Sequence, residues 1–408
     1  MARKKMPEEA LPEKIRVDGE IKRRENRYYA NVADRYRICG FLMILLLAVL
    51  SGSLMLVYGE YITYDNFVYM MRDFDSVTSS GDNFAEVTYE AQERASFESF
   101  RDGFAVIGTG RVTLFDRTGV ELCSESESFS YPAGSSSEKY LLAYDVGGKT
   151  YSIYNSVTRV MKSTTEKPIV SASVSDTGAY IITTESKDAK YLTELYTSAF
   201  RKSMTVYKDK YVIASAISGD GDTFALASVA EEGAELYTEI SFYEKGKDSP
   251  IKSYTYSMAM PLSVTSFSDG GFSLLCDDGV RFYDNKGEQK NERTFDGETV
   301  SYFDASDKSL MLVCRTNAMG SENRVYSLDN KGKILYDGII AVKATGCAAS
   351  VTDGYEGYVI SPGVVTALRS EGEHAVIEMP DDVLALTDTD GGAVVMTPDK
   401  AFRLFNKK

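Results

Sequence analysis

The sequence predicts an all-β fold, a β-propeller of about eight four-stranded blades preceded by one transmembrane α-helix. Short β-branched and aromatic runs, separated by turns rich in Gly, Asp, Asn and Ser, recur from about residue 95 to the end of the 408-residue chain. Before them, residues 38–58 carry no charged side chain. The chain therefore divides into a tail (1–37), a span (38–58), a connector (59–94) and a propeller (95–408).

Charge is unevenly distributed along the chain. The formal net charge is −15, but residues 1–37 carry 11 basic and 7 acidic side chains, whereas residues 59–408 carry 34 and 53. The tail is therefore basic and the large C-terminal body is acidic. Because nucleic-acid binding needs clustered Lys and Arg, we expect no nucleic-acid partner.

The predicted span, Ile38 to Tyr58, reads ICGFLMILLLAVLSGSLMLVY. A helix of that length rises about 30 Å, which matches the hydrocarbon core of a bilayer. A cleaved signal peptide has a shorter apolar stretch that ends in a small-residue cleavage site, and no A-x-A pattern follows here. We therefore expect an uncleaved signal anchor in contact with membrane lipid.

Basic residues beside the span predict its orientation. On the C-terminal side, Arg72 is the one basic residue within about 20 positions of the span. The N-terminal side carries a cluster of topology-setting residues: Lys22, Arg23, Arg24, Arg27, Arg35 and Arg37. Since basic flanks stay in the cytoplasm, we expect a single-pass cell-membrane protein with a cytoplasmic N-terminus and an extracytoplasmic C-terminal domain.

The connector contains two predicted elements. Tyr61, Tyr64, Val68 and Met71 keep a helix-like spacing, which indicates that the anchor helix continues outward as a juxtamembrane helix. After a polar stretch, residues 83–90 (NFAEVTYE) read as a strand. We expect this early strand to complete the last blade and close the ring.

The propeller prediction rests on eight similar units. Each unit has a polar turn, an apolar strand, a second turn, and a strand that often ends in Tyr or Phe before Asp or Asn. The central apolar strands start near residues 104, 140, 179, 223, 272, 309, 357 and 393. The mean spacing of about 41 residues is that of a four-stranded blade.

Two alternatives to the eight-bladed ring stay open. One irregular copy would reduce the count to seven blades. An array of β-sandwich domains would show linkers about every 100 residues, and none is evident between residues 100 and 408.

The turn and strand units SDGGFSLLCDDGVRFYDNKG and VTLFDRTGVEL resemble the degenerate repeats of WD40-like and quinoprotein-like propellers. The Trp-Asp signature is absent because the chain has no tryptophan. The plan of basic tail, single span and acidic propeller is similar to an uncharacterised family of bacterial single-span membrane proteins. The resemblance implies a propeller fold and implies no activity.

The sequence offers no catalytic, metal or cofactor site. His374, in EHAVIEM, is the one histidine, which argues against a Ser-His-Asp triad or a multi-histidine metal site. We expect it to be structural or incidental. Carboxylate pairs for glycoside hydrolysis stay open, because acidic residues are abundant and their separation is not visible in the sequence.

Five cysteines lack any metal-ligand spacing. Cys276 and Cys314 occupy equivalent central strands of neighbouring units, in SLLCDD and MLVCRT. A disulfide between them is one alternative. Packed sheets lie about 10 Å apart, farther than a disulfide spans, so we expect buried free thiols instead.

In two turns, Asp residues occupy every second position, a spacing that suits the binding of hard cations. Asp220 and Asp222 lie in SGDGDTF, and Asp388 and Asp390 lie in TDTDGG. Neither continues into an EF-hand loop. Asp and Gly also serve turn geometry, which is the simpler interpretation.

The sequence supports three functional hypotheses. The first is a membrane-anchored binding or scaffolding propeller for a protein, peptide or wall-polymer partner outside the cell, because loops on a rigid scaffold commonly carry recognition. The second is a carboxylate-based hydrolase or a quinoprotein-like enzyme in the propeller channel, which the lack of histidine weakens. The third is a sensor that relays binding to the short cytoplasmic tail.

Overall fold

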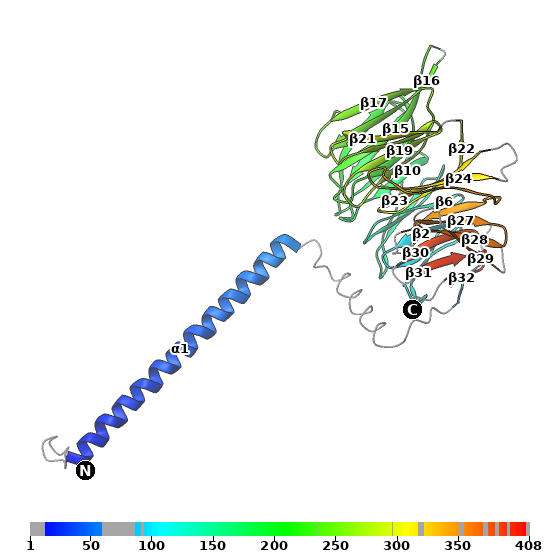
Figure 1. The fold of residues 1–408 in the computed structure, drawn as a ribbon. Helices are drawn as coiled ribbons and strands as arrows, with labels where there is room; N and C mark the ends of the chain where they lie inside the picture. The colour runs from blue at the N-terminus through cyan, green and yellow to red at the C-terminus, as the bar shows by residue number, and fades with distance from the viewer. Residues whose placement is uncertain are drawn as a thin grey trace. The chain divides into compact units, whose positions relative to one another are not determined.

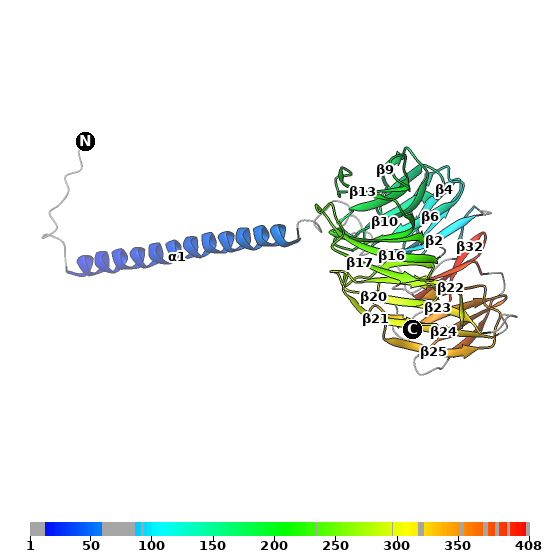
Figure 2. The same ribbon diagram turned by 90° about the horizontal axis from the view of Figure 1, so that it is seen from above.

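A computed structural model shows an N-terminal helix and an all-β domain, which are treated as two separate units (Figures 1 and 2). The structure describes residues 13–58, 86–90, 94–233, 235–295, 297–316, 322–350, 355–369, 374–379, 383–389 and 392–404. Within the helix, side chains are described from residue 31 to residue 53. The predicted juxtamembrane helix after Tyr58 lies outside the described residues.

Helix α1 runs from Glu13 to Tyr58, so it contains the predicted span and also most of the basic tail. Its most apolar part, Asn31–Ser53, is long enough to cross a membrane. All the described side chains of that part from Ile38 onward are apolar or small and uncharged.

The strands form eight antiparallel four-stranded sheets, which confirms the eight-bladed count over the seven-bladed one. The first half of the ring has four blades, each given from its inner to its outer strand. Blade 1 has β2 (Ala95–Phe100), β3 (Gly103–Gly108), β4 (Arg111–Phe115) and β5 (Glu121–Ser126). Blade 2 has β6 (Pro132–Ser136), β7 (Leu141–Asp145), β8 (Thr150–Tyr154) and β9 (Arg159–Thr164). Blade 3 has β10 (Ile169–Val174), β11 (Tyr180–Glu185), β12 (Tyr191–Tyr196) and β13 (Lys202–Lys208). Blade 4 has β14 (Tyr211–Ile217), β15 (Thr223–Glu232), β16 (Glu235–Glu244) and β17 (Lys252–Ser257).

The second half of the ring keeps the same order. Blade 5 has β18 (Pro261–Ser266), β19 (Phe272–Cys276), β20 (Gly279–Tyr283) and β21 (Gln289–Thr294). Blade 6 has β22 (Thr299–Ala305), β23 (Ser309–Arg315), β24 (Asn323–Asp329) and β25 (Ile334–Ile340). Blade 7 has β26 (Gly346–Ala349), β27 (Gly357–Ser361), β28 (Val364–Leu368) and β29 (His374–Glu378). Blade 8 has β30 (Ala385–Thr389), β31 (Gly392–Met396), β32 (Lys400–Arg403) and β1 (Val87–Thr88).

Strand β1 closes the ring, as predicted from residues 83–90. Val87 pairs with Ala401 and Thr88 with Lys400 in an antiparallel ladder. The Tyr89 hydroxyl then donates to the carbonyl oxygen of Thr397, at 2.6 Å. An N-terminal strand therefore serves as the outer strand of the C-terminal blade, which holds the two ends of the domain together.

The second strand of each blade starts within one residue of its predicted position. These strands are almost wholly buried because both of their faces pack against neighbouring blades. The core accordingly consists of eight apolar clusters, one between each pair of adjacent blades. A continuous ring of blade contacts excludes the array of separate sandwich domains.

The recurring aspartate after the third strand caps a tight turn. Asp116, Asp284 and Asp329 each accept two backbone N–H groups from the following turn through Oδ1. Each turn then contains a glycine with positive φ, for example Gly287 at φ 73°. The motif read as a repeat in the sequence is therefore a turn that joins the third and fourth strands.

All five cysteines are free. Cys276 and Cys314 do occupy equivalent second strands, but they lie in different clusters, between blades 4 and 5 and between blades 5 and 6. Burial raises the pKa of each thiol to about 12. Both behave as small apolar core residues.

Candidate functional site

The two faces of the propeller ring carry different strand ends and different turns. The inner strand of every blade begins at one face, which we call the start face, and the turns between second and third strands reach the same face. Strand β1 runs antiparallel to β32, so the chain coming from the connector enters the ring from the opposite face. Strand β1 therefore begins at the face opposite the start face.

No metal-binding group is evident in the described residues, since no three His, Cys, Asp or Glu side chains are placed to hold an ion. His374 is exposed at the start of β29, an outer strand, and belongs to no such group in the described part of the chain. The incidental role expected for His374 stays a prediction.

The acidic turn between β14 and β15 shows turn contacts. Asp220 Oδ1 accepts the Ser218 hydroxyl at 2.5 Å and the backbone N–H of Asp222 at 3.0 Å. The Asp222 carboxylate lies 3.5 Å from Nζ of Lys245. The side chain of Asp388 and the whole of Asp390 lie outside the described residues. Cation binding at the two turns stays a prediction.

Two carboxylates on the inner strands of separate blades interact electrostatically. Glu98 lies on β2 of blade 1 and Asp304 on β22 of blade 6, and both side chains are half-buried. Burial, followed by the charge of Asp304, raises the pKa of Glu98 to about 7. Burial raises the pKa of Asp304 to about 6. These two groups therefore hold protons more tightly than ordinary carboxyls do.

Both carboxylates also have structural contacts. Asp304 Oδ2 accepts the backbone N–H of Ala349 on the next inner strand, at 2.8 Å. Ser173 Oγ accepts the N–H of Ile217 in the same way, so such side chains link neighbouring inner strands. Glu98 packs against Gly134, where an added Cβ would lie 2.6 Å from its Cγ. The pair is thus part of the inner wall of the ring.

The most distinctive surface is an apolar patch on the start face and inner strands of blades 4 to 6. Half of the large apolar side chains exposed on the described propeller lie there. Met258, in the turn between β17 and β18, is 79% exposed. We call this set the 4–6 patch: Tyr211, Ile213, Leu236, Met258, Met260, Leu262, Tyr302 and Phe303.

The blade 4 and blade 5 residues of the 4–6 patch come together through neighbouring elements. Strand β14, with Ile213, lies against β18, with Leu262. The backbone N–H of Met258 donates to the carbonyl oxygen of Leu236, at 2.9 Å. The N–H of Met260 donates to Asp277 Oδ1 at 2.7 Å, which fixes the turn before β18. The patch is therefore held on ordered backbone.

β-Bulges expose two residues of the patch. The inner strands of blades 3 to 6 each carry a register shift near their start, at Val170, Ile213, Leu262 and Ser301. A bulge inserts an unpaired residue and re-aims its side chain. Ile213 and Leu262 are 39% and 37% exposed as a result, although both would be suited to the core.

The inner strands are farther apart within the patch than elsewhere. In the described part of the ring, the other neighbouring inner strands approach one another closely, whereas β18 and β22 do not. Tyr302 and Phe303, on β22, are 37% and 42% exposed. As consecutive strand residues they point to opposite faces of the blade.

The rim of the patch carries three exposed carboxylates and one exposed cation, Lys190, whose Nζ lies 4.0 Å from the centroid of the Tyr211 ring. Strands β15 and β16 form a long hairpin that projects from blade 4 and carries exposed Glu231 and Glu235 near its tip (Figure 1). Asp209 is exposed in the turn that precedes β14. In the described residues, none of these three carboxylates forms an ion pair. Carboxylates that form no ion pair and lie next to exposed apolar side chains are better suited to binding a partner than to stabilising the fold.

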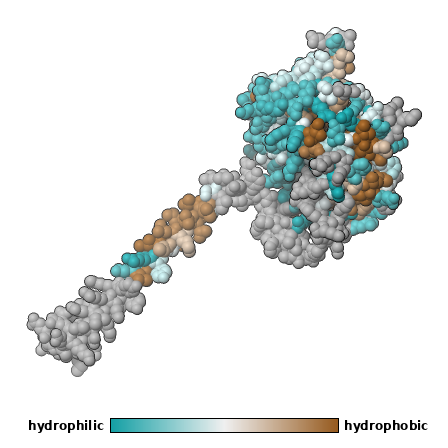
Figure 3. Space-filling model, in the orientation of Figure 1, coloured by the Kyte–Doolittle hydropathy of each residue, from teal (hydrophilic) through white to brown (hydrophobic). Residues whose placement is uncertain are grey.

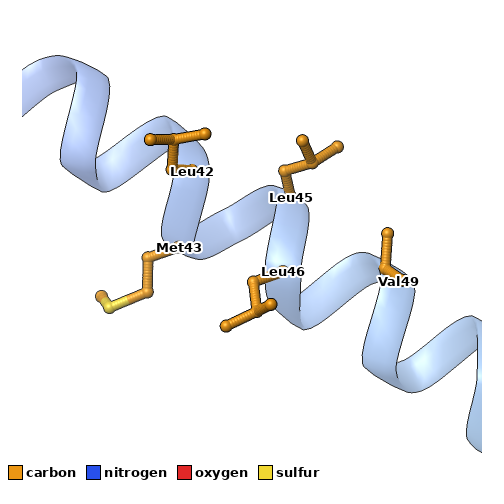
Figure 4. A pocket seen from close by; sticks show the side chains of 5 residues that line it. All are labelled: Leu42, Met43, Leu45, Leu46 and Val49. Atoms are coloured by element: carbon orange, nitrogen blue, oxygen red, sulfur yellow. The ribbon is translucent and has the colours of Figure 1, made fainter.

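Helix α1 presents a second apolar surface. Leu42, Leu45 and Val49 lie along one side of the helix, with Met43 and Leu46 beside them (Figure 4). No part of this apolar stretch is buried within the described structure. Figure 3 shows it as a continuous apolar band, whereas the visible propeller surface is mostly hydrophilic with separate apolar patches.

The basic residues beside the span are partly described. Arg35 and Arg37 are exposed on α1, and Arg37 Nη1 lies 3.7 Å from Asp34 Oδ1. The backbone of α1 includes Lys22, Arg23, Arg24 and Arg27, whose side chains lie outside the described residues. All six residues therefore lie on one helix that continues into the apolar stretch.

The 4–6 patch was not predicted from the sequence, although one signal for it was visible. The turn before β18 reads SMAMPL, which is apolar where the turns between other units are mostly polar. Glu98 and Asp304 had no comparable signal, because blades 1 and 6 are about 200 residues apart in the chain.

Comparison with known proteins supports the fold and assigns no activity. A family model described as a family of unknown function, DUF5711, matches residues 77–351, about two thirds of the chain. No curated protein matches. Among solved structures, one titled as the eukaryotic initiation factor is 13% identical, with a TM-score of 0.51, and the match covers 79% of this chain and 85% of the other. Hsv2 of Kluyvelomyces marxianus is 8% identical, with a TM-score of 0.44 and coverage of 70% and 97%.

Proposed function

Since the chain belongs to DUF5711, a family of unknown function, we propose its role from its own architecture: a membrane-anchored propeller that binds a partner outside the cell through its start face. The 4–6 patch carries this proposal. Large exposed apolar patches on soluble domains commonly mark interaction sites. The other exposed apolar side chains of the described propeller lie in ones and twos on blades 1, 2, 3, 6, 7 and 8, which is ordinary for a protein surface.

The anchor supports the proposed location. The apolar stretch Asn31–Ser53 is long enough to span a bilayer and is unburied, and the basic residues lie on its N-terminal side. In this arrangement the tail is cytoplasmic and the propeller is extracytoplasmic. Protease added outside wall-stripped cells should digest the propeller and spare the tail. Digestion of the tail alone would overturn the orientation.

The direction of β1 also favours binding at the start face. Strand β1 begins at the opposite face of the ring, so its first residues do not cover the patch.

Co-purification tests the proposal. The full chain, solubilised from membranes, should retain a partner that is lost when Met258 and Leu262 are both replaced by serine. The matched control is Val120→Ser, because Val120 is 59% exposed in the turn between β4 and β5 on the opposite face. Equal recovery of every bound protein by the two variants would contradict a binding role for the patch.

A second candidate function, hydrolysis in the channel, is favoured by one observation. Glu98 and Asp304 hold protons more tightly than ordinary carboxyls, as a general acid does. Asp304 is already engaged by the Ala349 N–H, which limits its freedom to act on a substrate. Turnover of a supplied glycan that is abolished by Glu98→Gln would favour this alternative.

A further inference from the structure

We infer that the partner of the 4–6 patch is a protein segment that combines large apolar side chains with Lys or Arg. This inference rests on the proposed function and adds the chemistry of the partner. The carrying observation is the juxtaposition of the patch with unpaired exposed carboxylates: Asp209, Glu231 and Glu235.

The apolar part of the partner follows from the shape and position of the patch. Leu236, Met258 and Leu262 lie on neighbouring elements of blades 4 and 5, and Tyr302 and Phe303 are exposed on the inner strand of blade 6. They come from three consecutive blades, so a ligand must contact several separated side chains at once. Flexible Met side chains adapt to such a surface, and aromatic side chains supply much of the contact area.

The basic part follows from charge. Glu231 and Glu235 project on the hairpin of β15 and β16, and Asp209 precedes β14, so blade 4 presents three unpaired carboxylates. Lys190, over the Tyr211 ring, offsets part of this charge, and the carboxylates outnumber it. Exposed carboxylates around an apolar centre attract a cationic partner and repel an anionic one. Their effect is mainly on association rate and selectivity, while the apolar centre supplies most of the affinity.

Charge also argues against other occupants. A second copy of the propeller would bring another acidic body against this rim, since residues 59–408 carry 53 acidic and 34 basic side chains. Anionic lipids and anionic wall polymers are disfavoured for the same reason. The chain's own basic tail lies on the other side of the membrane in the proposed topology.

Selection from a random peptide library displayed on phage tests the inference. The bait is the full chain in nanodiscs of zwitterionic lipid, with empty nanodiscs used for counter-selection. Enriched peptides should contain large apolar residues together with Lys or Arg. The double variant Glu231→Lys, Glu235→Lys should weaken their binding by about three- to tenfold, and added salt should weaken it in the wild type.

Two controls separate the charge from the patch. Asp248→Lys reverses an exposed carboxylate in the turn between β16 and β17, on the opposite face, and should leave binding unchanged. Met258→Ser with Leu262→Ser should abolish binding. Apolar peptides that lack Lys and Arg and bind the Glu231→Lys, Glu235→Lys variant equally well would overturn the basic-partner inference while leaving the proposed function intact. Peptides that bind the Met258→Ser, Leu262→Ser variant as tightly as the wild type would overturn both the basic-partner inference and the proposed function.

Discussion

At the scale of single residues, the described carboxylates differ in role according to their neighbours. Glu127 has no exposed side-chain surface, and it accepts hydrogen bonds from Tyr154, Ser152 and Lys162, each at 2.6 Å, and from Arg159 at 3.0 Å. Although burial opposes ionisation, these donors hold the pKa of Glu127 below its usual range. Glu127 therefore connects the segment after blade 1 to blade 2.

Replacing this carboxylate should destabilise the ring. Glu127→Gln keeps the size of the side chain but removes the charge that compensates Lys162 and Arg159. We expect a loss of about 2 kcal/mol, measured as a lower midpoint of urea unfolding. Glu125→Gln is the control. The Glu125 side chain is 37% exposed and its one ion pair, with Arg159, is longer, at 3.4 Å. Its replacement should therefore have little effect on the midpoint. Equal midpoints for the two variants would contradict the structural role of Glu127.

The pKa of Glu98 is raised, whereas that of Glu127 is lowered. The raised pKa predicts that stability depends on pH. The pKa of Glu98 is raised in the folded protein, from an ordinary value of 4.5 to about 7, so the native state binds more protons than the unfolded chain between the two pKa values. Stability should therefore fall as pH rises from about 4.5 to about 7. Glu98→Gln should make the melting temperature less dependent on pH in that window. An unchanged pH profile in this variant would show that Glu98 titrates normally.

At the scale of elements, the strands were predictable and their irregularities were not. The second strands are buried on both faces, so apolar runs between turn residues identified them to within one residue. The bulges at Ile213 and Leu262 depend on pairing with β15 and β19, and no local sequence pattern marks them. An apolar residue at a strand start reads as core in the sequence, whereas the bulge exposes it.

The same contrast applies to the candidate site. The Asp116, Asp284 and Asp329 turns are local, with donor and acceptor a few residues apart, and they were visible as a repeat. Glu98 and Asp304 interact electrostatically because the ring closes and leaves only blades 7 and 8 between blades 6 and 1. Contacts that depend on closure require the three-dimensional structure.

Ring closure itself is testable at β1. Val87 is buried in the cluster between blades 8 and 1, whereas Thr88, next to it, is exposed. Val87→Asp should open the last blade, at a cost of about 3 kcal/mol, because it buries a charge without a partner. Faster hydrogen exchange of β32 is the expected measurement. Thr88→Asp should leave exchange unchanged, and similar exchange in both variants would contradict closure by β1.

At the scale of the whole molecule, the net charge of −15 combines a basic tail, an uncharged stretch and an acidic propeller. The start face adds a further asymmetry, because exposed apolar side chains are concentrated on blades 4 to 6. The chain enters the ring from the other face. This arrangement is what a tethered binding module requires, and the proposed binding role depends on the 4–6 patch.

Photo-crosslinking in intact cells tests the patch in its native setting. A photoreactive amino acid at position 258, in place of Met258, should give a discrete adduct with one partner upon irradiation. The same group at position 120, in place of Val120 on the opposite face, should give none. Adducts of the same size and abundance from both positions, or none from either while the protein is present at normal level, would contradict binding through the 4–6 patch.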